Sequence, residues 1–465
     1  MSIDFEQHFT SKTQDAIALH LVKPDDWTNW LAKQSPDQSK WLAVQGCEGK
    51  SGEFAYLADA SGQPNMAVCV IDLSKPWCFA KLATSLKRGT YEIVEHQQRE
   101  LACLKRACLE WGLSAYRFAQ YQSEVKPFEA KLVWPIAAAD QKQVIDWLTV
   151  WGLVRDLINL PAEDCTPQTL QDTVMQLADE HDGQHQVFDG EDLRMGFPAI
   201  YAVGRAGALP PRLVEMTWGN PKHPTLTIVG KGVCFDTGGL NLKPTAGIRH
   251  MKKDMGGAAH AIGLAKQLML SQAKLFIRLL VPAVENAISH QAYRPGDIIK
   301  TRAGKSVEID NTDAEGRLIL GDAITYAQEH ACDLLLDFAT LTGAARVALG
   351  TDIPGFFTKN KVYQHDLMVK ADQSHDPLWP LPLYDGYADQ LKTPIADLKN
   401  CASTPYGGAI TAALYLQHFV KDQTQWVHFD MMAGNQSTRP GRPEGGELQG
   451  LMAVSAWLKE TLKSD

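Results

Sequence analysis

The sequence has no long hydrophobic run and no excess of positive charge. No apolar stretch approaches the roughly 18 residues that a membrane-spanning helix needs. Residues 1–6 show neither the basic nor the apolar character of a secretory leader. The net charge of −9 disfavours non-specific binding to nucleic acid or to an anionic membrane surface. We therefore expect a cytoplasmic protein whose partners are neither membranes nor nucleic acids.

The sequence also lacks cysteines at the spacing of a zinc or redox motif. Its nine cysteines are odd in number and scattered, and even the closest two, Cys103 and Cys108, match no common motif. Free cysteine behaves as a small hydrophobic residue, and thiols stay reduced in the cytoplasm. We interpret the cysteines as reduced thiols in the core of a cytoplasmic protein.

The length and composition predict more than one domain. The chain has 465 residues, of which 45% are hydrophobic and 21% charged, which is typical of a globular protein with a full core. Residues 1–138 mix strand-like and helix-like runs without a chemical motif and predict a smaller N-terminal α/β domain. Residues 139–160 carry apolar side chains at helical spacing and end at Pro161, which predicts a linker helix before a larger domain of residues 161–465.

Helical patterns alternate with short apolar runs from residue 165 onward. The expected strands are 199–203, 213–216, 225–229, 275–282, 334–338 and 427–431. The expected helices are 168–180, 255–270, 317–330, 410–420 and 448–462. This alternation predicts an α/β/α domain with a central mixed sheet. Ligands of such sheets bind beyond the carboxyl ends of the strands, and two charged clusters fall at such positions.

The two clusters combine four acids with two lysines and an arginine in glycine-rich sequence. The members are Lys231, Asp236, Lys243 and Asp254 in the first cluster and Asp313, Glu315 and Arg317 in the second. Isolated charges are costly to bury, so groups of this kind pair with one another or hold a metal ion. Four acids against two lysines leave a negative charge that two divalent cations would neutralise.

Taken one at a time, these residues have ordinary structural interpretations. Asp254 and Asp313 could accept hydrogen bonds from the free N–H groups of the helices that follow them. Arg317 could form an ion pair with Asp313, four residues earlier. Taken together, the carboxylates are the hard oxygen ligands that divalent cations prefer. A lysine beside two such ions can lose its proton, which makes Lys231 a possible nitrogen ligand and leaves Lys243 as a cationic electrophile.

Three segments carry a resemblance to a known family. Residues 230–244, residues 253–259 and the octapeptide 311–318, Asn-Thr-Asp-Ala-Glu-Gly-Arg-Leu, resemble the leucyl aminopeptidase (cytosol aminopeptidase) family, peptidase family M17. Further matches are residues 159–167, 338–344 and 407–414. The resemblance covers residues 155–435, and the octapeptide is very specific to the family.

The resemblance implies a metal-dependent aminopeptidase, which hydrolyses the N-terminal residue from peptides with a free amino terminus. It implies two divalent ions per subunit, zinc or manganese with magnesium or cobalt as alternatives. The implied metal ligands are Lys231, Asp236, Asp254, Asp313 and Glu315. By similarity, Asp236 and Glu315 bridge the two ions, and a water bridged by both ions attacks the peptide.

The resemblance also implies roles for residues around the metals. Lys243 would act as the electrophile that polarises the scissile carbonyl, and Arg317 would hold a bicarbonate that serves as general base. Substrate-binding positions match Met251, Thr340 and Leu341. Members of the family form hexamers, so a homohexamer is implied. Residues 433–443 differ from the family's usual ending in a region that helps to form the first specificity pocket.

Two other functions compete with this interpretation. Acid clusters with two metals also serve phosphatases and nucleases, but those sites commonly use histidine ligands, and none of the fourteen histidines lies inside the matched motifs. The second alternative is a scaffold protein with a metal site that has lost its activity and a first domain that binds nucleotide or DNA. Every matched metal and catalytic position is present, which favours the enzyme.

Overall fold

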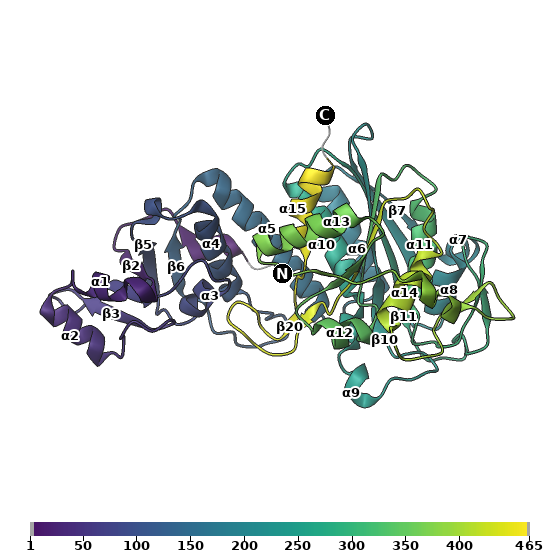
Figure 1. Cartoon of the computed structure of the whole chain (residues 1–465), viewed down its shortest axis with the longest axis horizontal. Helices are drawn as coiled ribbons and strands as arrows, with labels where there is room; N and C mark the ends of the chain where they lie inside the picture. Colours follow the sequence, from purple (N-terminus) through teal and green to yellow (C-terminus); the bar gives the residue numbers. More distant parts are fainter. Residues whose placement is uncertain (1–3, 463–465) are drawn as a thin grey trace. The chain divides into compact units, whose positions relative to one another are not determined.

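The structure, a computed structural model, describes residues 4–462 in two units (Figure 1). Unit 1 comprises Met1–Gly152 with Ser437–Glu444, and unit 2 comprises Leu153–Gln436 with Gly445–Asp465. Residues 1–3, part of the segment that shows no leader character, lie outside the described residues, as do residues 463–465. The helix expected over 139–160 is α5 (Ala138–Asn159), and the boundary between the units falls within it.

Unit 1 contains a six-stranded mixed sheet in the order β1-β6-β5-β2-β4-β3. The strands are β1 (Phe9–Thr10), β2 (Ile17–Val22), β3 (Phe54–Ala58), β4 (Pro64–Val70), β5 (Gly89–Ile93) and β6 (Ala130–Val133). Only the β3–β4 pair is antiparallel. The helices besides α5 are α1 (Trp27–Leu31), α2 (Pro36–Val44), α3 (Cys78–Ala83) and α4 (Leu101–Ala115). The α/β character expected for this part of the chain is confirmed.

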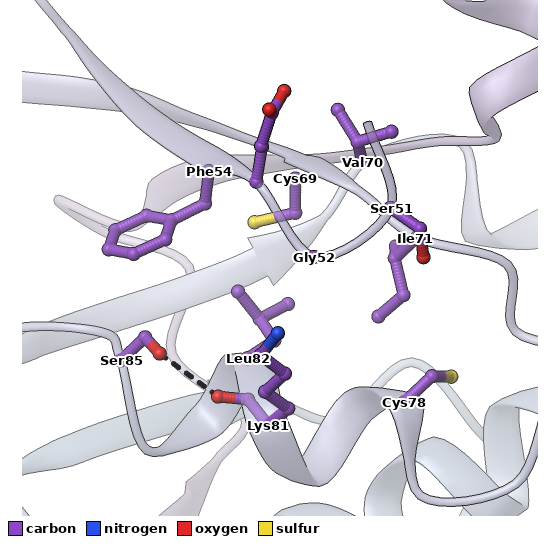
Figure 2. Close-up of a pocket in the computed structure, with 11 residues that line it drawn as sticks. Ser51, Gly52, Phe54, Cys69, Val70, Ile71, Cys78, Lys81, Leu82 and Ser85 are labelled. Carbon is purple, nitrogen blue, oxygen red and sulfur yellow. Dashed lines mark hydrogen bonds between the residues drawn. The ribbon is translucent and has the colours of Figure 1, made fainter. Parts of the chain in front are cut away.

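A pocket of about 100 Å³ in unit 1 lies between α3 and the segments 51–54 and 69–71 (Figure 2). Cys69 and Cys78 are among its lining residues. Burial raises the pKa of the Cys69 thiol well above its ordinary value and that of Cys78 to about 12. Neither sulfur is therefore a nucleophilic thiolate at neutral pH. All nine cysteines are free, in agreement with the expected reduced thiols.

Unit 2 is built on a nine-stranded mixed sheet in the order β16-β15-β18-β14-β9-β11-β8-β7, with β10 paired to β11. Its central strands β11, β9, β14 and β18 are parallel to one another, and β7, β8 and β15 introduce antiparallel pairs. The bounds are β7 (Gln184–Phe188), β8 (Arg212–Gly219), β9 (Thr225–Gly230), β10 (Gly232–Asp236), β11 (Phe276–Asn286), β14 (Leu334–Ala339), β15 (Gly355–Phe357), β16 (Trp379–Pro380) and β18 (Trp426–Asp430). Strands β7, β10, β15 and β16 were not expected from the sequence.

Helices cover both faces of this sheet, as predicted (Figure 1). One face carries α6 (Pro167–Glu180), α10 (Gly256–Leu270), α13 (Lys361–Ser374) and α15 (Leu451–Thr461). The other face carries α7 (Gly190–Gly196), α8 (Pro198–Gly204), α11 (Gly316–Ala327) and α14 (Gly408–Gln417). Shorter elements near the carboxyl edge are α9 (Thr245–Ile248), the 3₁₀ turn η4 (Met251–Met255) and α12 (Gly343–Leu349).

The prediction of a strand at 199–203 is wrong, because these residues form helix α8. Pro198 occupies the first turn, where its fixed φ favours a helix. The buried Asp322 accepts hydrogen bonds from the N–H groups of Ala199 (2.8 Å) and Ile200 (3.3 Å), which satisfies the start of the helix. A short helix that is buried on nearly every side shows the same continuous apolar run as a buried strand. The other strands and helices expected in unit 2 are present.

Candidate metal centre

The charged residues of both clusters gather at the carboxyl ends of the central strands of unit 2. Lys231 follows β9 directly, Asp236 ends β10, and Thr340 follows β14. Asp254 lies in η4 before α10, and Asp313 and Glu315 lie just before α11. This is the edge of an α/β sheet where ligands bind. Main-chain hydrogen bonds between neighbouring strands hold the ends that carry these residues close together. The N–H of Lys231 donates to the carbonyl of Phe338 on β14 at 3.0 Å.

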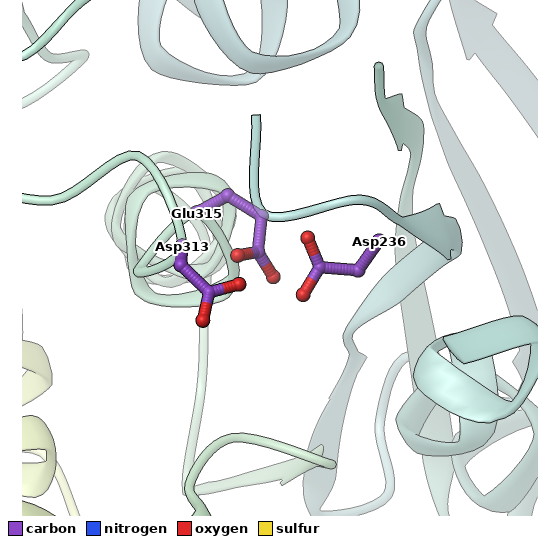
Figure 3. Close-up of side chains that lie close together, drawn as sticks. All are labelled: Asp236, Asp313 and Glu315. Atoms are coloured by element: carbon purple, nitrogen blue, oxygen red, sulfur yellow. The ribbon is translucent and has the colours of Figure 1, made fainter. Parts of the chain in front are cut away.

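Three carboxylates form the centre of the cluster. Each of Asp236, Asp313 and Glu315 offers an oxygen, and these oxygens lie within 4.8 Å of one another. Figure 3 shows the three side chains directed toward one another, Asp236 from the end of its strand and the other two from the turn before α11. Asp236 and Glu315 are buried and Asp313 is half-buried. Oxygen ligands at this separation suit a divalent cation.

Two lysines connect these acids with Asp254. Lys231 Nζ lies 2.8 Å from Asp254 Oδ2 and 3.0 Å from Glu315 Oε1, and it donates to the carbonyl of Thr340 at 3.1 Å. Lys243 Nζ lies 2.8 Å from Asp236 Oδ2 and also pairs with Asp313. The structure therefore brings Lys231, Asp236, Lys243, Asp254, Asp313 and Glu315 into one continuous cluster.

Two of the close contacts in the cluster require a glycine. Gly238 has a φ of +86° and donates its N–H to Asp236 Oδ1 at 2.9 Å, so the turn after β10 fixes one oxygen of that carboxylate. A Cβ on Gly316 would lie 2.5 Å from Lys231 Cε. The first residue of α11 must therefore lack a side chain for the lysine to reach Glu315.

The electrostatics of the cluster show an excess of negative charge. Burial, followed by the neighbouring carboxylates, raises the pKa of Asp236 to about 6 and that of Glu315 to about 8. Burial opposes the charge of Lys231, but Asp254 and Glu315 outweigh it and raise the pKa of the lysine. Burial acts against Asp254 as well, yet Lys231 and then Lys253 outweigh it and lower its pKa. When all four carboxylates are ionised, they and the two ammonium groups sum to two negative charges.

The donor set fits divalent cations. Glu315 Oε2 is buried and has no hydrogen-bond partner among the residues that the structure describes. Such an atom is costly unless a ligand satisfies it. A dication between the carboxylates would also reverse the repulsion that raises the pKa values of Asp236 and Glu315. The residues present thus fit the metals that the sequence implies.

The capping and pairing interpretations of single residues are wrong. Helix α10 begins at Gly256, after the turn that contains Asp254, and α11 begins at Gly316 with Glu315 as its N-terminal flank and no side-chain cap. Asp313 pairs with Lys243. Arg317 is buried and donates from Nη1 to the carbonyl of Asn400 at 2.7 Å, and its Nε has no partner among the described residues.

Of the three residues expected around the substrate, Thr340 contacts the cluster directly. Met251 begins η4, three residues before Asp254, and is half-buried. Thr340 Oγ1 donates to Asp254 Oδ1 at 2.8 Å, so this side chain also supports a carboxylate of the cluster. The N–H of Leu341 donates to the buried Asp430 Oδ1 at 3.0 Å.

Sequence reasoning missed the residues that hold the octapeptide loop. Asn400 Oδ1 accepts from the N–H groups of Asp310 (2.9 Å) and Asn311 (3.2 Å). Thr312 Oγ1 donates to the carbonyl of Gly238 at 2.6 Å and accepts from the N–H of Asn241 at 2.9 Å. Asn400 lies outside every matched segment, and the part that Thr312 of the octapeptide plays in holding the loop is revealed only by the three-dimensional contacts.

Comparison with known proteins decides the family. The model of the "Cytosol aminopeptidase family, catalytic domain" matches residues 152–454. The model of the "M17 aminopeptidase, N-terminal domain" matches residues 17–135. The chain belongs to the cytosol aminopeptidase family, M17. Membership classes the chain as an aminopeptidase and extends the resemblance to the N-terminal part, where sequence analysis found no motif.

Several relatives of this aminopeptidase are known by sequence. The chain is 36% identical to the probable cytosol aminopeptidase of Stenotrophomonas maltophilia over 90% of its own length and 89% of that protein. It is 42% identical to the probable cytosol aminopeptidase of Thermosynechococcus vestitus, where the match spans 60% of this chain and 56% of the relative. These names agree with the cytoplasmic location expected from the sequence.

Solved structures show the same fold. A cytosol aminopeptidase from Coxiella burnetii superimposes with a TM-score of 0.94 at 43% identity, covering 97% of this chain and 98% of that one. The bottromycin maturation enzyme BotP, solved in complex with Mn, has a TM-score of 0.85 at 28% identity, covering 97% of this chain and all of that one (100%). No helix within residues 4–462 combines the length and the apolar character needed to cross a membrane.

Proposed function

We propose that this aminopeptidase hydrolyses the first peptide bond of peptides with a free amino terminus and uses two divalent ions to do so. The observation that carries the proposal is the convergence of Asp236, Asp313 and Glu315 within 4.8 Å, extended by Lys231 to Asp254. The ligands are Lys231, Asp236, Asp254, Asp313 and Glu315, and the metals are zinc or manganese, with magnesium or cobalt as alternatives. When bound, the ions supply Lewis acidity toward the scissile carbonyl and lower the pKa of a shared water.

Lys243 acts as the electrophile of the reaction. Its ammonium group pairs with Asp236 and Asp313, and these carboxylates raise its pKa despite burial. The side chain is 16% exposed, so water still solvates part of the charge. A lysine that keeps its proton beside the cluster donates hydrogen bonds to the carbonyl oxygen and stabilises the negative charge that develops on it.

Arg317 supplies the binding site of the general base. Its guanidinium is buried beside the cluster and holds only the carbonyl of Asn400 by a described hydrogen bond, which leaves Nε free for an anion. Arg317 would hold a bicarbonate there, and the bound anion would supply the general base of the reaction. Met251, Thr340 and Leu341 border the site and contact the first residue of the peptide.

The proposal is tested by removing and restoring metal. The chelated protein should lose hydrolysis of leucyl p-nitroanilide and regain it with Mn²⁺ or Zn²⁺, and an N-acetylated substrate should remain intact. Full activity without any bound metal would contradict the proposal. A phosphodiester assayed in parallel separates the phosphoesterase alternative, and fewer than one ion per subunit after reconstitution supports the inactive scaffold.

We propose a homohexamer as the working form, on the strength of the family membership. Light scattering should then give six times the chain mass of 51.3 kDa. A monomer at assay concentration would contradict this part of the proposal and leave the chemistry standing.

A further inference from the structure

Asn286 is a buried amide that belongs to none of the matched motifs. It is the last residue of β11 and pairs in register with Asp236 at the end of β10. Its side chain is fully buried (0% exposed). Nδ2 donates to Asp236 Oδ1 at 2.8 Å and to the carbonyl of Thr312 at 3.1 Å. One amide group thus joins a metal-ligand carboxylate to the loop that carries Asp313.

The orientation of this amide is fixed by its partners. A carboxylate oxygen and a backbone carbonyl are both acceptors, so only the NH₂ end can face them. The opposite end, Oδ1, is buried and has no partner among the residues that the structure describes. An unsatisfied buried acceptor is unfavourable, so the two bonds made by Nδ2 must outweigh that loss.

As a consequence, the two oxygens of Asp236 have different surroundings. Oδ1 receives two N–H donors, one from Gly238 at 2.9 Å and one from Asn286. Oδ2 lies 2.8 Å from Lys243 Nζ and has no such backbone contact. The carboxylate therefore cannot rotate without losing two hydrogen bonds, and Oδ2 stays directed at the cluster.

We propose that Asn286 is a positioning residue that presets Asp236 for cation binding. It touches neither substrate nor reacting atoms and acts through the carboxylate that it holds. The inference rests on the proposed metal-dependent function. Partners behind a metal ligand typically contribute a factor of about 10–100 in metal affinity.

The test compares Mn²⁺ affinity of the full chain with two variants, by calorimetric titration after chelation. Asn286→Leu removes the donor while it keeps the approximate shape of the side chain. Tyr293→Phe is the matched control: its hydroxyl donates to the same Thr312 carbonyl at 2.7 Å and makes no described bond to Asp236. We expect at least a tenfold weaker Mn²⁺ affinity for Asn286→Leu and less than a threefold change for Tyr293→Phe.

The melting temperature of each metal-free variant separates positioning from folding. If Asn286→Leu fails to fold, Asn286→Ala, which also lacks the donor, replaces it. A folded variant at position 286 that binds Mn²⁺ within tenfold of the unmodified protein overturns the inference. Equal weakening by Tyr293→Phe also overturns it, since the loop tether would then explain the effect. An unmodified protein that binds none of Mn²⁺, Zn²⁺, Mg²⁺ and Co²⁺ overturns the proposed function instead, and this inference with it.

Discussion

Replacing Lys231 with methionine tests the charge balance of the cluster directly. The ammonium group is buried between Asp254 Oδ2 (2.8 Å) and Glu315 Oε1 (3.0 Å), and its side chain is 3% exposed. Methionine fills a similar volume but leaves both carboxylates without their cation. Breaking a buried ion pair in this way costs about 3–5 kcal/mol, because the remaining charge stays buried and uncompensated. For a unit of this size, that loss lowers the melting temperature by roughly 5–8 °C.

The stability lost in Lys231→Met should depend on pH, and the direction of that dependence follows from the pKa values of Asp254 and Glu315. Lys231 lowers the pKa of Asp254 and opposes the rise in the pKa of Glu315 to about 8. Without it, the folded protein binds protons that the unfolded chain, with ordinary carboxyl pKa values, has released. A folded state that holds extra protons loses stability as pH rises. The deficit of Lys231→Met should therefore be larger at pH 8 than at pH 6.

Thermal melting of the chelated protein at both pH values measures this effect, and Lys253→Met is the matched control. Lys253 is also buried, but its Nζ has no hydrogen-bond partner among the described residues. Burial and then Arg346 lower its pKa to about 7. Its replacement removes a desolvated amine, which offsets the loss of its attraction to Asp254, so the melting temperature should fall by less than that of Lys231→Met. A Lys231→Met protein that melts like the control, or whose deficit does not grow toward pH 8, would refute the reasoning.

Three further outcomes follow from the same geometry. Lys243→Ala should lower kcat at least tenfold with the metal content unchanged by atomic emission; turnover within tenfold would exclude the electrophile role. Gly316→Ala should destabilise the metal-free protein by about 1–3 kcal/mol in chemical denaturation, because its Cβ would lie 2.5 Å from Lys231 Cε; no measurable change would mean that the lysine moves aside. Mn²⁺ affinity should rise from pH 6 to pH 8, because Glu315, with its pKa raised to about 8, must release a proton to bind metal; an affinity independent of pH would contradict that shift.

Much of the catalytic unit could be predicted from periodicity, because its central strands and long helices have distinct patterns. Strands such as β9 and β14 are short apolar runs at the expected places. Helix α6 begins at Pro167, and Thr166 before it forms a capping box with Thr169. The error at α8 arose where a short helix is buried and its cap comes from Asp322, more than one hundred residues later. Information of that kind is absent from a local window of sequence.

The candidate site also contains residues that the sequence identifies and residues that only the fold reveals. The residues of the cluster could be named from the sequence as candidate ligands, because each of them belongs to a compact motif. The residues that support these candidates could not be recognised as supports. Asn286 and Asn400 lie outside every matched motif, and Thr340 was expected only to bind substrate, because a supporting role depends on which atoms lie opposite a side chain in the fold. Hydrogen bonds from such partners determine which oxygen of a carboxylate faces the cluster. The orientation of the carboxylates is therefore a property of the tertiary structure.

The two lysines illustrate why residue type alone does not assign a chemical role. Both have carboxylate neighbours that raise the pKa and burial that opposes the charge. Their side chains differ in exposure, 3% for Lys231 against 16% for Lys243. If dications neutralise the carboxylates, the attraction that raises the pKa of each lysine is lost and only the effect of burial remains. Burial favours the neutral amine most strongly at the more buried site. This difference supports the proposed roles, in which Lys231 would serve as a nitrogen ligand and Lys243, still partly solvated, would keep its proton as the electrophile.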